Sequence, residues 1–208
     1  MQHMEAGVEL LRTQQVLQLA DEIGIVRPCD LQTRGIPRVY LQRLYKRGLL
    51  QRSGRGLYFR IDADITEHHS LAEACKRVPN GVICLLSALR YHDLTTQNAH
   101  LIWMAISNSA HPPSLDYPRL RIIRLSGQAL TAGVEDHKID GVNVRIYNAA
   151  KTVADCFKFR NKIGLDVGIE ALRDYWRGGM GSLDDLWQYA KICRVAIIMR
   201  PYLESLTS

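Results

Sequence analysis

The sequence of 208 residues contains no apolar run as long as the roughly 18–20 residues that a membrane-spanning helix needs. Its opening residues also lack a basic segment followed by an apolar segment, so no secretory signal is expected. Both absences predict a cytoplasmic protein that has no membrane partner.

Cysteine pairs with the spacing of a metal site are also absent. The five cysteines form no CxxC motif, and they are scattered along the chain. Scattered cysteines in odd number are typical of buried thiols in a reducing compartment rather than of disulfides. We therefore expect neither a metal nor a cofactor.

Motifs of common enzyme classes are missing as well. The sequence has no GxSxG motif, no phosphate-binding loop and no dinucleotide-binding fingerprint. His68 and His69 are adjacent, and we interpret them as a solvent-facing pair near a helix start, with no carboxylate at the spacing of a helical metal site. The acids Glu135, Asp136 and Asp140 leave a magnesium nuclease open, although a charged hairpin is the preferred interpretation. We predict no catalytic residue and a protein that is not an enzyme.

Acidic residues are absent from the segment between Arg34 and Arg60, which contains eight basic residues. The charge of this segment exceeds the net charge of +6 of the whole chain, so the remaining residues are net negative. Solvated surfaces usually mix both signs, whereas a local concentration of one sign indicates an anion-binding surface. The basic residues are Arg34, Arg38, Arg43, Lys46, Arg47, Arg52, Arg55 and Arg60.

The first 64 residues predict a winged helix-turn-helix. Apolar spacing and the positions of glycine and proline indicate helices over residues 9–22, 28–34 and 37–47. Strands are expected over residues 49–52 and 57–60, joined by a glycine-rich turn over residues 53–56. Three helices followed by a hairpin form the outline of this DNA-binding domain, which we place at residues 1–64.

The third helix has two faces when its residues are placed at 100° intervals. Tyr40, Leu41, Leu44 and Tyr45 fall on an apolar face. The opposite face is basic or amide except for Val39, and its long side chains suit base edges and phosphates in the major groove of DNA. Val39 is placed to touch a thymine methyl group. The other members of this face are Arg38, Gln42, Arg43, Lys46 and Arg47.

The hairpin is expected to be the wing. Leu50, Leu57 and Phe59 face the domain core, while the small residues of the tip carry Arg55 toward phosphates or a minor groove. Five phosphate contacts would give a slope of log K against log salt of about −4.5. Arg60 is expected to neutralise the acidic junction that follows it. The predicted DNA-binding residues are Arg34, Arg38, Val39, Gln42, Arg43, Lys46, Arg47, Arg52, Ser53 and Arg55.

The remaining chain, residues 65–208, predicts a mixed α/β domain that ends in a helical bundle, which makes the whole protein α+β. Helices are expected over residues 70–79 and 81–94, strands over 100–107 and 119–126, and a hairpin over 135–147 that turns at Asp140-Gly141. Asn148 and Ser182 are expected to cap later helices, the latter in a capping box with Asp185. The last helix should kink or break before Pro201. Trp176 and Trp187 are expected in the core.

Three segments resemble the AbiEi-type antitoxins of type IV abortive-infection toxin–antitoxin modules. "GIPRVYLQRLYKRGLLQRSGRGLYF" is similar to the family's N-terminal winged helix. "NGVICLLSALRYHDLTT" is similar to a buried helix that leads into its sheet, and "IDGVNVRIYNAAKTVADCFKFRNKIGLDVGIEALR" to its C-terminal segment. The resemblance extends from about residue 13 to about residue 206.

The resemblance implies a transcriptional repressor that is also an antitoxin in phage defence. The N-terminal domain would repress its own operon by binding inverted repeats, with self-association on DNA, and the C-terminal domain would counter a nucleotidyltransferase-like toxin. No family motif assigns single antitoxin residues. Alternatives are an orphan regulator without a toxin, a nuclease that docks through the winged helix, and a module that binds an acidic protein. The DNA-binding roles carry over to Arg38, Gln42, Arg43, Lys46, Arg47, Arg52 and Arg55.

Overall fold

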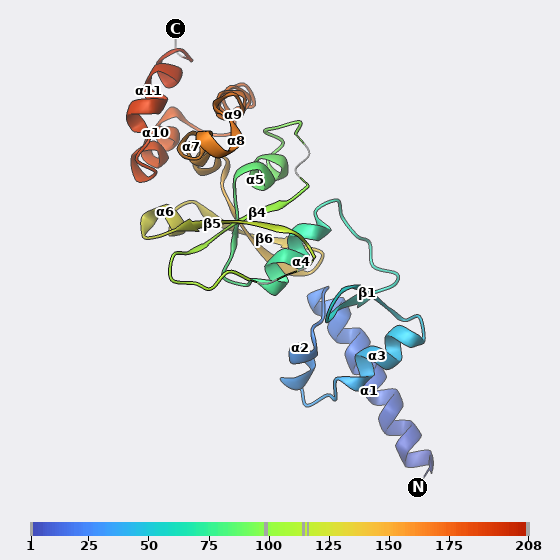
Figure 1. Cartoon of the computed structure of the whole chain (residues 1–208). Helices are drawn as coiled ribbons and strands as arrows, with labels where there is room; N and C mark the ends of the chain where they lie inside the picture. Colours follow the sequence, from blue (N-terminus) through green and yellow to red (C-terminus); the bar gives the residue numbers. More distant parts are fainter. Residues whose placement is uncertain (1, 98–99, 114, 116, 207–208) are drawn as a thin grey trace. The chain divides into compact units, whose positions relative to one another are not determined.

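The computed structural model describes residues 2–97, 100–113, 115 and 117–206, and the fold is α+β, as the sequence predicts (Figure 1). The chain divides into two compact units. Unit 1 comprises residues 1–76 and 138–143, and unit 2 comprises residues 77–137 and 144–208. The described residues contain no helix that is long and apolar enough to span a membrane.

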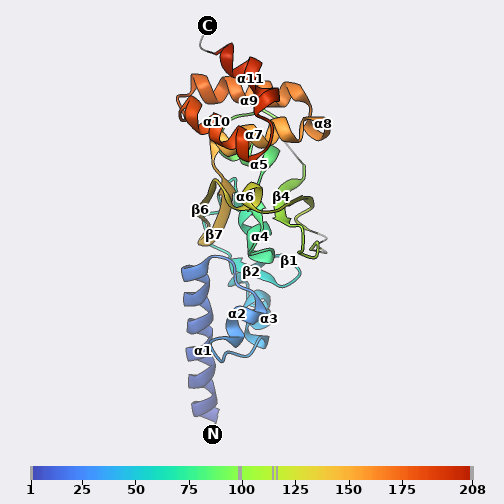
Figure 2. The same ribbon diagram turned by 90° about the vertical axis from the view of Figure 1, so that its left-hand side faces the viewer.

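Unit 1 begins with three helices. They are α1 (Gln2–Ile23), α2 (Pro28–Gln32) and α3 (Val39–Lys46), and Figure 2 shows α1 as one long helix beside the other two. The start expected near residue 9 is wrong: Met4, Glu5 and Ala6 have high helix propensity, and α1 begins at Gln2 and continues through Gly7. Leu19 of α1, Leu31 of α2 and Leu44 of α3 are buried in a common core.

The apolar face of α3 is narrower than predicted. Tyr40, Leu41 and Leu44 are buried, as expected, but 46% of the Tyr45 surface is exposed. Tyr45 lies at the border of the predicted face, where its ring contacts the edge of Tyr58 with 6.4 Å between ring centroids. The face of α3 that is buried in the core therefore consists of Tyr40, Leu41 and Leu44, without Tyr45.

The expected hairpin is formed by β1 (Leu50–Gly54) and the antiparallel β2 (Leu57–Arg60). Arg52 is opposite Tyr58 and Gly54 is opposite Leu57, so Ser53 is an extra residue in a β-bulge. The predicted four-residue turn is therefore wrong: the bulge lets β1 continue, and only Arg55 and Gly56 connect the strands. Val26 adds a short bridge to β2 through backbone hydrogen bonds of 2.7 and 3.0 Å with Tyr58.

Unit 1 also contains α4 (His69–Arg77), except for its last residue, and residues 138–143. These residues include Asp140 and Gly141, which have φ values of +46° and +77°. Positive φ at both positions is the geometry of a type I′ turn, so the hairpin predicted from Asp140-Gly141 is confirmed. The turn touches the end of α1: a Cβ on Gly24 would overlap the carbonyl oxygen of Asp140, and one on Gly141 would lie 2.6 Å from the Gly24 nitrogen.

Unit 2 contains most of a five-stranded sheet with the strand order β5-β4-β3-β7-β6, in which only residues 138–143 of the β6-β7 hairpin are assigned to unit 1. Its strands are β3 (Val82–Ile83), β4 (Ile102–Ser107), β5 (Leu120–Leu125), β6 (Val134–Ile139) and β7 (Val142–Tyr147). β3 pairs in parallel with β7 and antiparallel with β4, and β4 pairs in parallel with β5. The helix expected over residues 81–94 is therefore wrong at its start. The β-branched pair Val82-Ile83 lies in the sheet, and α5 (Leu85–Tyr91) begins after it.

The C-terminal part of unit 2 is helical, and Figure 2 shows α7, α9, α10 and α11 together at one end of the unit. Asn148 caps α7 through a 2.9 Å bond from the Lys151 amide, and Ser182 and Asp185 form the expected capping box of α10. A break before Pro201 is wrong, because α11 continues through this residue. The core position expected for Trp176 is also wrong, since 38% of its surface is exposed. The helices are α6 (Gln128–Thr131), α7 (Ala149–Lys158), α8 (Arg160–Ile163), α9 (Leu165–Arg177), α10 (Leu183–Ile192) and α11 (Ala196–Glu204).

A buried ion pair lies inside this helical part. The Lys151 ammonium donates to Oδ2 of Asp155 one helical turn later, and the two side chains are 0% and 1% exposed. Lys151 Nζ also lies 4.1 Å from the centre of the Tyr147 ring, and the Cys193 thiol donates to Oδ1 of Asp155. Burial raises the pKa of Asp155, and the ammonium of Lys151 opposes this shift.

Candidate nucleic-acid interface

The polar face predicted for α3 is exposed. Arg38 is the N-cap of the helix, and Gln42 and Lys46 follow at successive four-residue intervals, so these three side chains form one row. Val39, Arg43 and Arg47 form a second row, and 43% of the Val39 surface is exposed. Since the buried face of α3 packs against α1 and β1, the domain core fixes the direction of both rows.

Part of the basic segment is neutralised by carboxylates that lie far away in the sequence. The Arg34 guanidinium lies 2.8 Å from Glu22, and that of Arg43 lies 3.4 Å from Glu9. Arg43 also lies over the Tyr40 ring, 5.4 Å from its centre. Both carboxylates belong to α1, so the segment without acids has acids beside it in space.

Four other basic side chains of this segment have no carboxylate partner among the described residues. The side chains of Arg38, Lys46, Arg47 and Arg55 are exposed, and within the described part of the chain none of them has an ion pair or a hydrogen bond. Arg38, Lys46 and Arg47 lie on or next to α3, while Arg55 lies at the tip of the hairpin. These four residues, which we call the free cations, are available to bind an anion without losing an internal partner.

The other two predicted residues of the hairpin are more constrained. Nε of Arg52 donates to the carbonyl of Gly54 at 3.0 Å, which holds this exposed side chain along the strand. The Ser53 hydroxyl at the bulge is buried and has no hydrogen-bond partner among the described residues. It is not presented to a ligand, and we therefore leave Ser53 out of the proposed DNA contacts.

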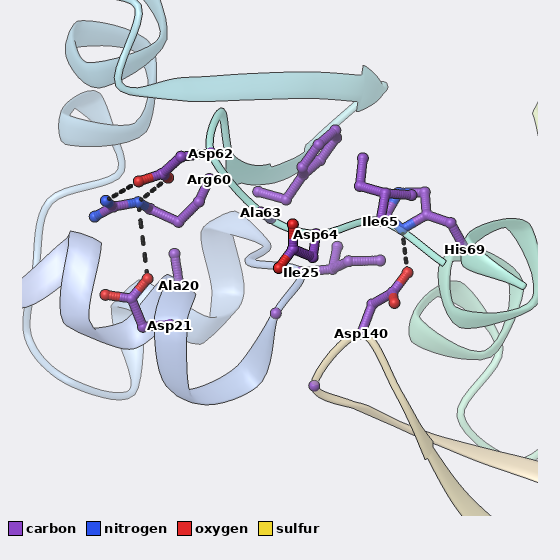
Figure 3. Close-up of a pocket in the computed structure, with 13 residues that line it drawn as sticks. Ala20, Asp21, Ile25, Arg60, Asp62, Ala63, Asp64, Ile65, His69 and Asp140 are labelled. Atoms are coloured by element: carbon purple, nitrogen blue, oxygen red, sulfur yellow. Dashed lines mark hydrogen bonds and ion pairs between the residues drawn. The ribbon is translucent and has the colours of Figure 1, made fainter. Parts of the chain in front are cut away.

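A small cavity of about 280 Å³ lies near the end of α1, and its lining is drawn in Figure 3. Arg60 lies there between Asp62 at 2.8 Å and Asp21 at 3.7 Å. Arg60 thus neutralises the acidic residues after the hairpin, as expected, and Asp62 is one of them. The hydrogen bond from Arg60 lowers the pKa of Asp62 to about 2.

His69 borders the same cavity, and its predicted exposure to solvent is wrong. Its side chain is 16% exposed, and Nδ1 lies 2.7 Å from Oδ2 of Asp140 (Figure 3). Nε2 lies 3.4 Å from the buried carboxylate of Glu73, four residues later on α4. The four-residue spacing of His69 and Glu73, which places both side chains on one face of α4, is the sequence pattern that predicts this contact.

Asp140 is occupied by protein contacts. Its Oδ2 faces His69, and its Oδ1 accepts a 3.3 Å hydrogen bond from the backbone N–H of Thr66. Both carboxylate oxygens of Asp140 are therefore engaged by groups of the protein itself. Within the residues that the structure describes, no group of three or more potential ligands is arranged to hold a metal ion.

The contacts of His69 predict a dependence of stability on pH. The carboxylate of Glu73, which lies 3.4 Å from Nε2, and next the hydrogen bond to Asp140 raise the pKa of His69 above its usual value of 6.5, against the opposing effect of burial. The imidazolium therefore stabilises the folded state fully below the unfolded pKa, and this stabilisation is lost as the pH rises through the folded pKa. We expect the free energy of unfolding, measured with urea, to fall as the pH rises above about 6.5.

His69→Gln should remove this part of the pH dependence, because glutamine does not titrate. His111→Gln is the matched control, since His111 is exposed and lies in unit 2. An unchanged pH dependence in His69→Gln would show that His69 does not contribute to it.

Residues 14–60 match the model of a protein family described as "Transcriptional regulator, AbiEi antitoxin". The matched segment runs from α1 to the end of β2, so it contains α3, the hairpin and all four free cations. The match confirms the resemblance predicted from the sequence over these residues. No curated protein matches the chain.

Proposed function

We propose that unit 1 is a winged helix-turn-helix that binds double-stranded DNA, because residues 14–60 match the model of a family described as "Transcriptional regulator, AbiEi antitoxin". The observation that carries this proposal is the exposure of four unpaired cations on α3 and the hairpin tip, inside the matched segment. Cations without internal partners can neutralise phosphates and release counterions at no cost to the fold.

In this proposal α3 enters the major groove, which admits one helix. The row of Arg38, Gln42 and Lys46 contacts bases or phosphates, because Arg suits guanine and Gln suits adenine. Arg47 and Arg43 position the helix on the backbone, and Val39 offers an apolar contact to a thymine methyl group. The ion pair with Glu9 partly neutralises Arg43, so Arg43 contributes less to DNA affinity than its position on α3 alone would suggest.

The hairpin is the wing, and Arg55 at its tip contacts the backbone or a minor groove. Arg52 lines the side of the wing. Arg34 lies beside the interface, but it is paired with Glu22 and contributes less. If each free cation neutralises one phosphate, log K should fall with log salt at a slope of about −3.6.

The proposed biological role is repression of the chain's own operon in the cytoplasm, through inverted repeats in the promoter. Self-association on the DNA would match such repeats, and the exposed Val8, Leu10 and Leu11 of α1 offer an apolar surface for it. We also propose an antitoxin role of unit 2 against a nucleotidyltransferase-like toxin in phage defence, a role implied only by the resemblance of its sequence segments to the AbiEi-type antitoxins, since the family match lies in unit 1. An orphan regulator would keep only the first role.

Fluorescence polarisation with a labelled promoter fragment tests the DNA-binding role. We expect binding that weakens with salt at the slope given above, and a preference for the promoter over scrambled DNA of the same length. Binding without salt dependence, or no binding at all, would contradict the proposal.

The antitoxin role needs a separate assay, in which the reading frame beside this gene is expressed with and without this chain. Growth arrest by the neighbour alone and recovery on co-expression would support it. Growth arrest without recovery would leave the regulator role and remove the antitoxin role.

A further inference from the structure

Unit 2 contains a cavity of about 600 Å³ where four elements meet. The end of β5, the start of α6 and the last turns of α7 and α10 form its walls. The volume lies within the range of about 300–1,000 Å³ that is typical of pockets for small molecules.

The charged side chains that line this cavity are all cationic. They are Arg124, Lys158, Lys191 and Arg194, and no aspartate or glutamate is among the lining residues. Nη1 of Arg124 donates to the carbonyls of Asn108 at 2.7 Å and Ala110 at 3.0 Å, which fixes the guanidinium. The other three have no ion pair or hydrogen bond of their side chains within the described part of the chain.

Helix dipoles explain part of this arrangement. Lys158 and Lys191 lie in the last turns of α7 and α10, where cations interact favourably with the C-terminal end of a helix. The helix dipole accounts for the position of each of these two lysines taken separately. It does not explain why Arg124 from a strand and Arg194 from a loop line the same cavity.

The backbone conformation of Arg194 is a second, independent observation that points to a binding site. Its φ is +60°, and its amide donates to the carbonyl of Lys191 while that of Val195 donates to Ala190, so it occupies the left-handed position after α10. Glycine is favoured at this position because a side chain strains the backbone. An arginine here keeps that strain and places a guanidinium at the cavity, and such strain is typical of binding sites.

The rest of the lining is partly apolar. Phe159 and Ile192 are half-buried at the cavity, beside the buried Leu125. A ligand for this site therefore needs a strongly anionic part for the four cations and a flat apolar part for the aromatic wall.

We propose that this cavity of unit 2 binds a nucleoside triphosphate. The polyphosphate lies among Arg124, Lys158, Lys191 and Arg194, and the base lies against Phe159 and Ile192. The site is separate from the DNA-binding surface proposed for unit 1, and its test does not depend on DNA.

Isothermal titration calorimetry of the full chain with ATP, GTP and inorganic tripolyphosphate tests the proposal. We expect saturable binding of a nucleotide that is tighter than binding of tripolyphosphate. Lys191→Gln with Arg194→Gly should weaken nucleotide binding at least tenfold. Arg173→Gln with Arg200→Gln removes two charges from exposed positions outside the cavity, and it should change binding less than twofold.

Arg194→Gly alone separates binding from folding, because glycine relieves the left-handed strain. We expect its melting temperature to rise while nucleotide affinity falls. Absence of nucleotide binding at millimolar concentration would overturn the proposal, and so would an equal loss in the control variant. Tripolyphosphate binding as tight as ATP would overturn the assignment of the base. A further outcome would also overturn the proposal: the chain binds no nucleotide, and Lys191→Gln with Arg194→Gly loses affinity for DNA. The cations of the cavity would then be assigned to DNA binding.

Discussion

Lys46→Ala together with Arg55→Ala should weaken binding to promoter DNA by roughly ten- to a hundredfold at moderate salt. The two residues represent α3 and the hairpin tip, and neither has an internal partner among the described residues. Loss of two phosphate contacts should also make the salt slope less steep by about 1.8. Fluorescence polarisation over a series of salt concentrations measures both quantities. Because both side chains are exposed, we expect the melting temperature to stay unchanged.

The matched control is Arg34→Ala together with Arg60→Ala. It removes the same charge from the same basic segment, but these two arginines are paired with Glu22 and Asp62. We expect a much smaller loss of DNA affinity. An equal loss in both variants would show that total charge, and not the exposure of the free cations, determines binding.

Lys151→Ala should destabilise unit 2 by about 3–5 kcal/mol, since it leaves the buried carboxylate of Asp155 without its cation. Neither side chain is more than 1% exposed, so water cannot replace the lost contact without opening the helical core. The remaining donor to Asp155 is the weak thiol of Cys193. Urea denaturation followed by circular dichroism measures the free energy of unfolding.

Removal of both charges at once distinguishes a buried unpaired charge from a general packing defect. Lys151→Met with Asp155→Asn removes both charges and keeps the approximate volume of both side chains, and we expect it to recover most of the lost stability. If the double variant is as unstable as Lys151→Ala, packing and not the charge accounts for the loss. A change below about 1 kcal/mol in Lys151→Ala would contradict the importance of the pair itself.

Local patterns were sufficient to predict α3 and the hairpin. The periodicity of Tyr40, Leu41 and Leu44 places one face in the core, and the glycines mark the ends of the elements. The bulge at Ser53 was not predictable in this way, because it depends on the register between two strands. Val82-Ile83 was missed for a similar reason, since two β-branched residues form a strand only when neighbouring strands are in place.

The candidate interface was predicted only in part. Counting charges along the sequence finds the basic segment, but it cannot find Glu9 and Glu22, which α1 brings beside Arg43 and Arg34. The tertiary structure therefore divides one uniform set of cations into paired and free members.

No sequence pattern predicts the cavity of unit 2. Its four cations are spread over residues 124–194, and each of them is an ordinary surface residue when it is read alone. Only the packing of β5 with α6, α7 and α10 brings them together. Sequence analysis is weakest for sites of this kind, in which the contributing residues come from several elements that are distant in the sequence.

The contact between Gly24 and Gly141 limits the substitutions that these two positions can accept. Both residues have positive φ, and the atoms that would collide with a new Cβ belong to the main chain at Gly24, Asp140 and Gly141. A clash with a side chain can be relieved by a second substitution that shortens the neighbour, whereas a clash with main chain has no such remedy. Neither glycine therefore has an accessible compensatory change, and a library randomised at both positions should return glycine at each.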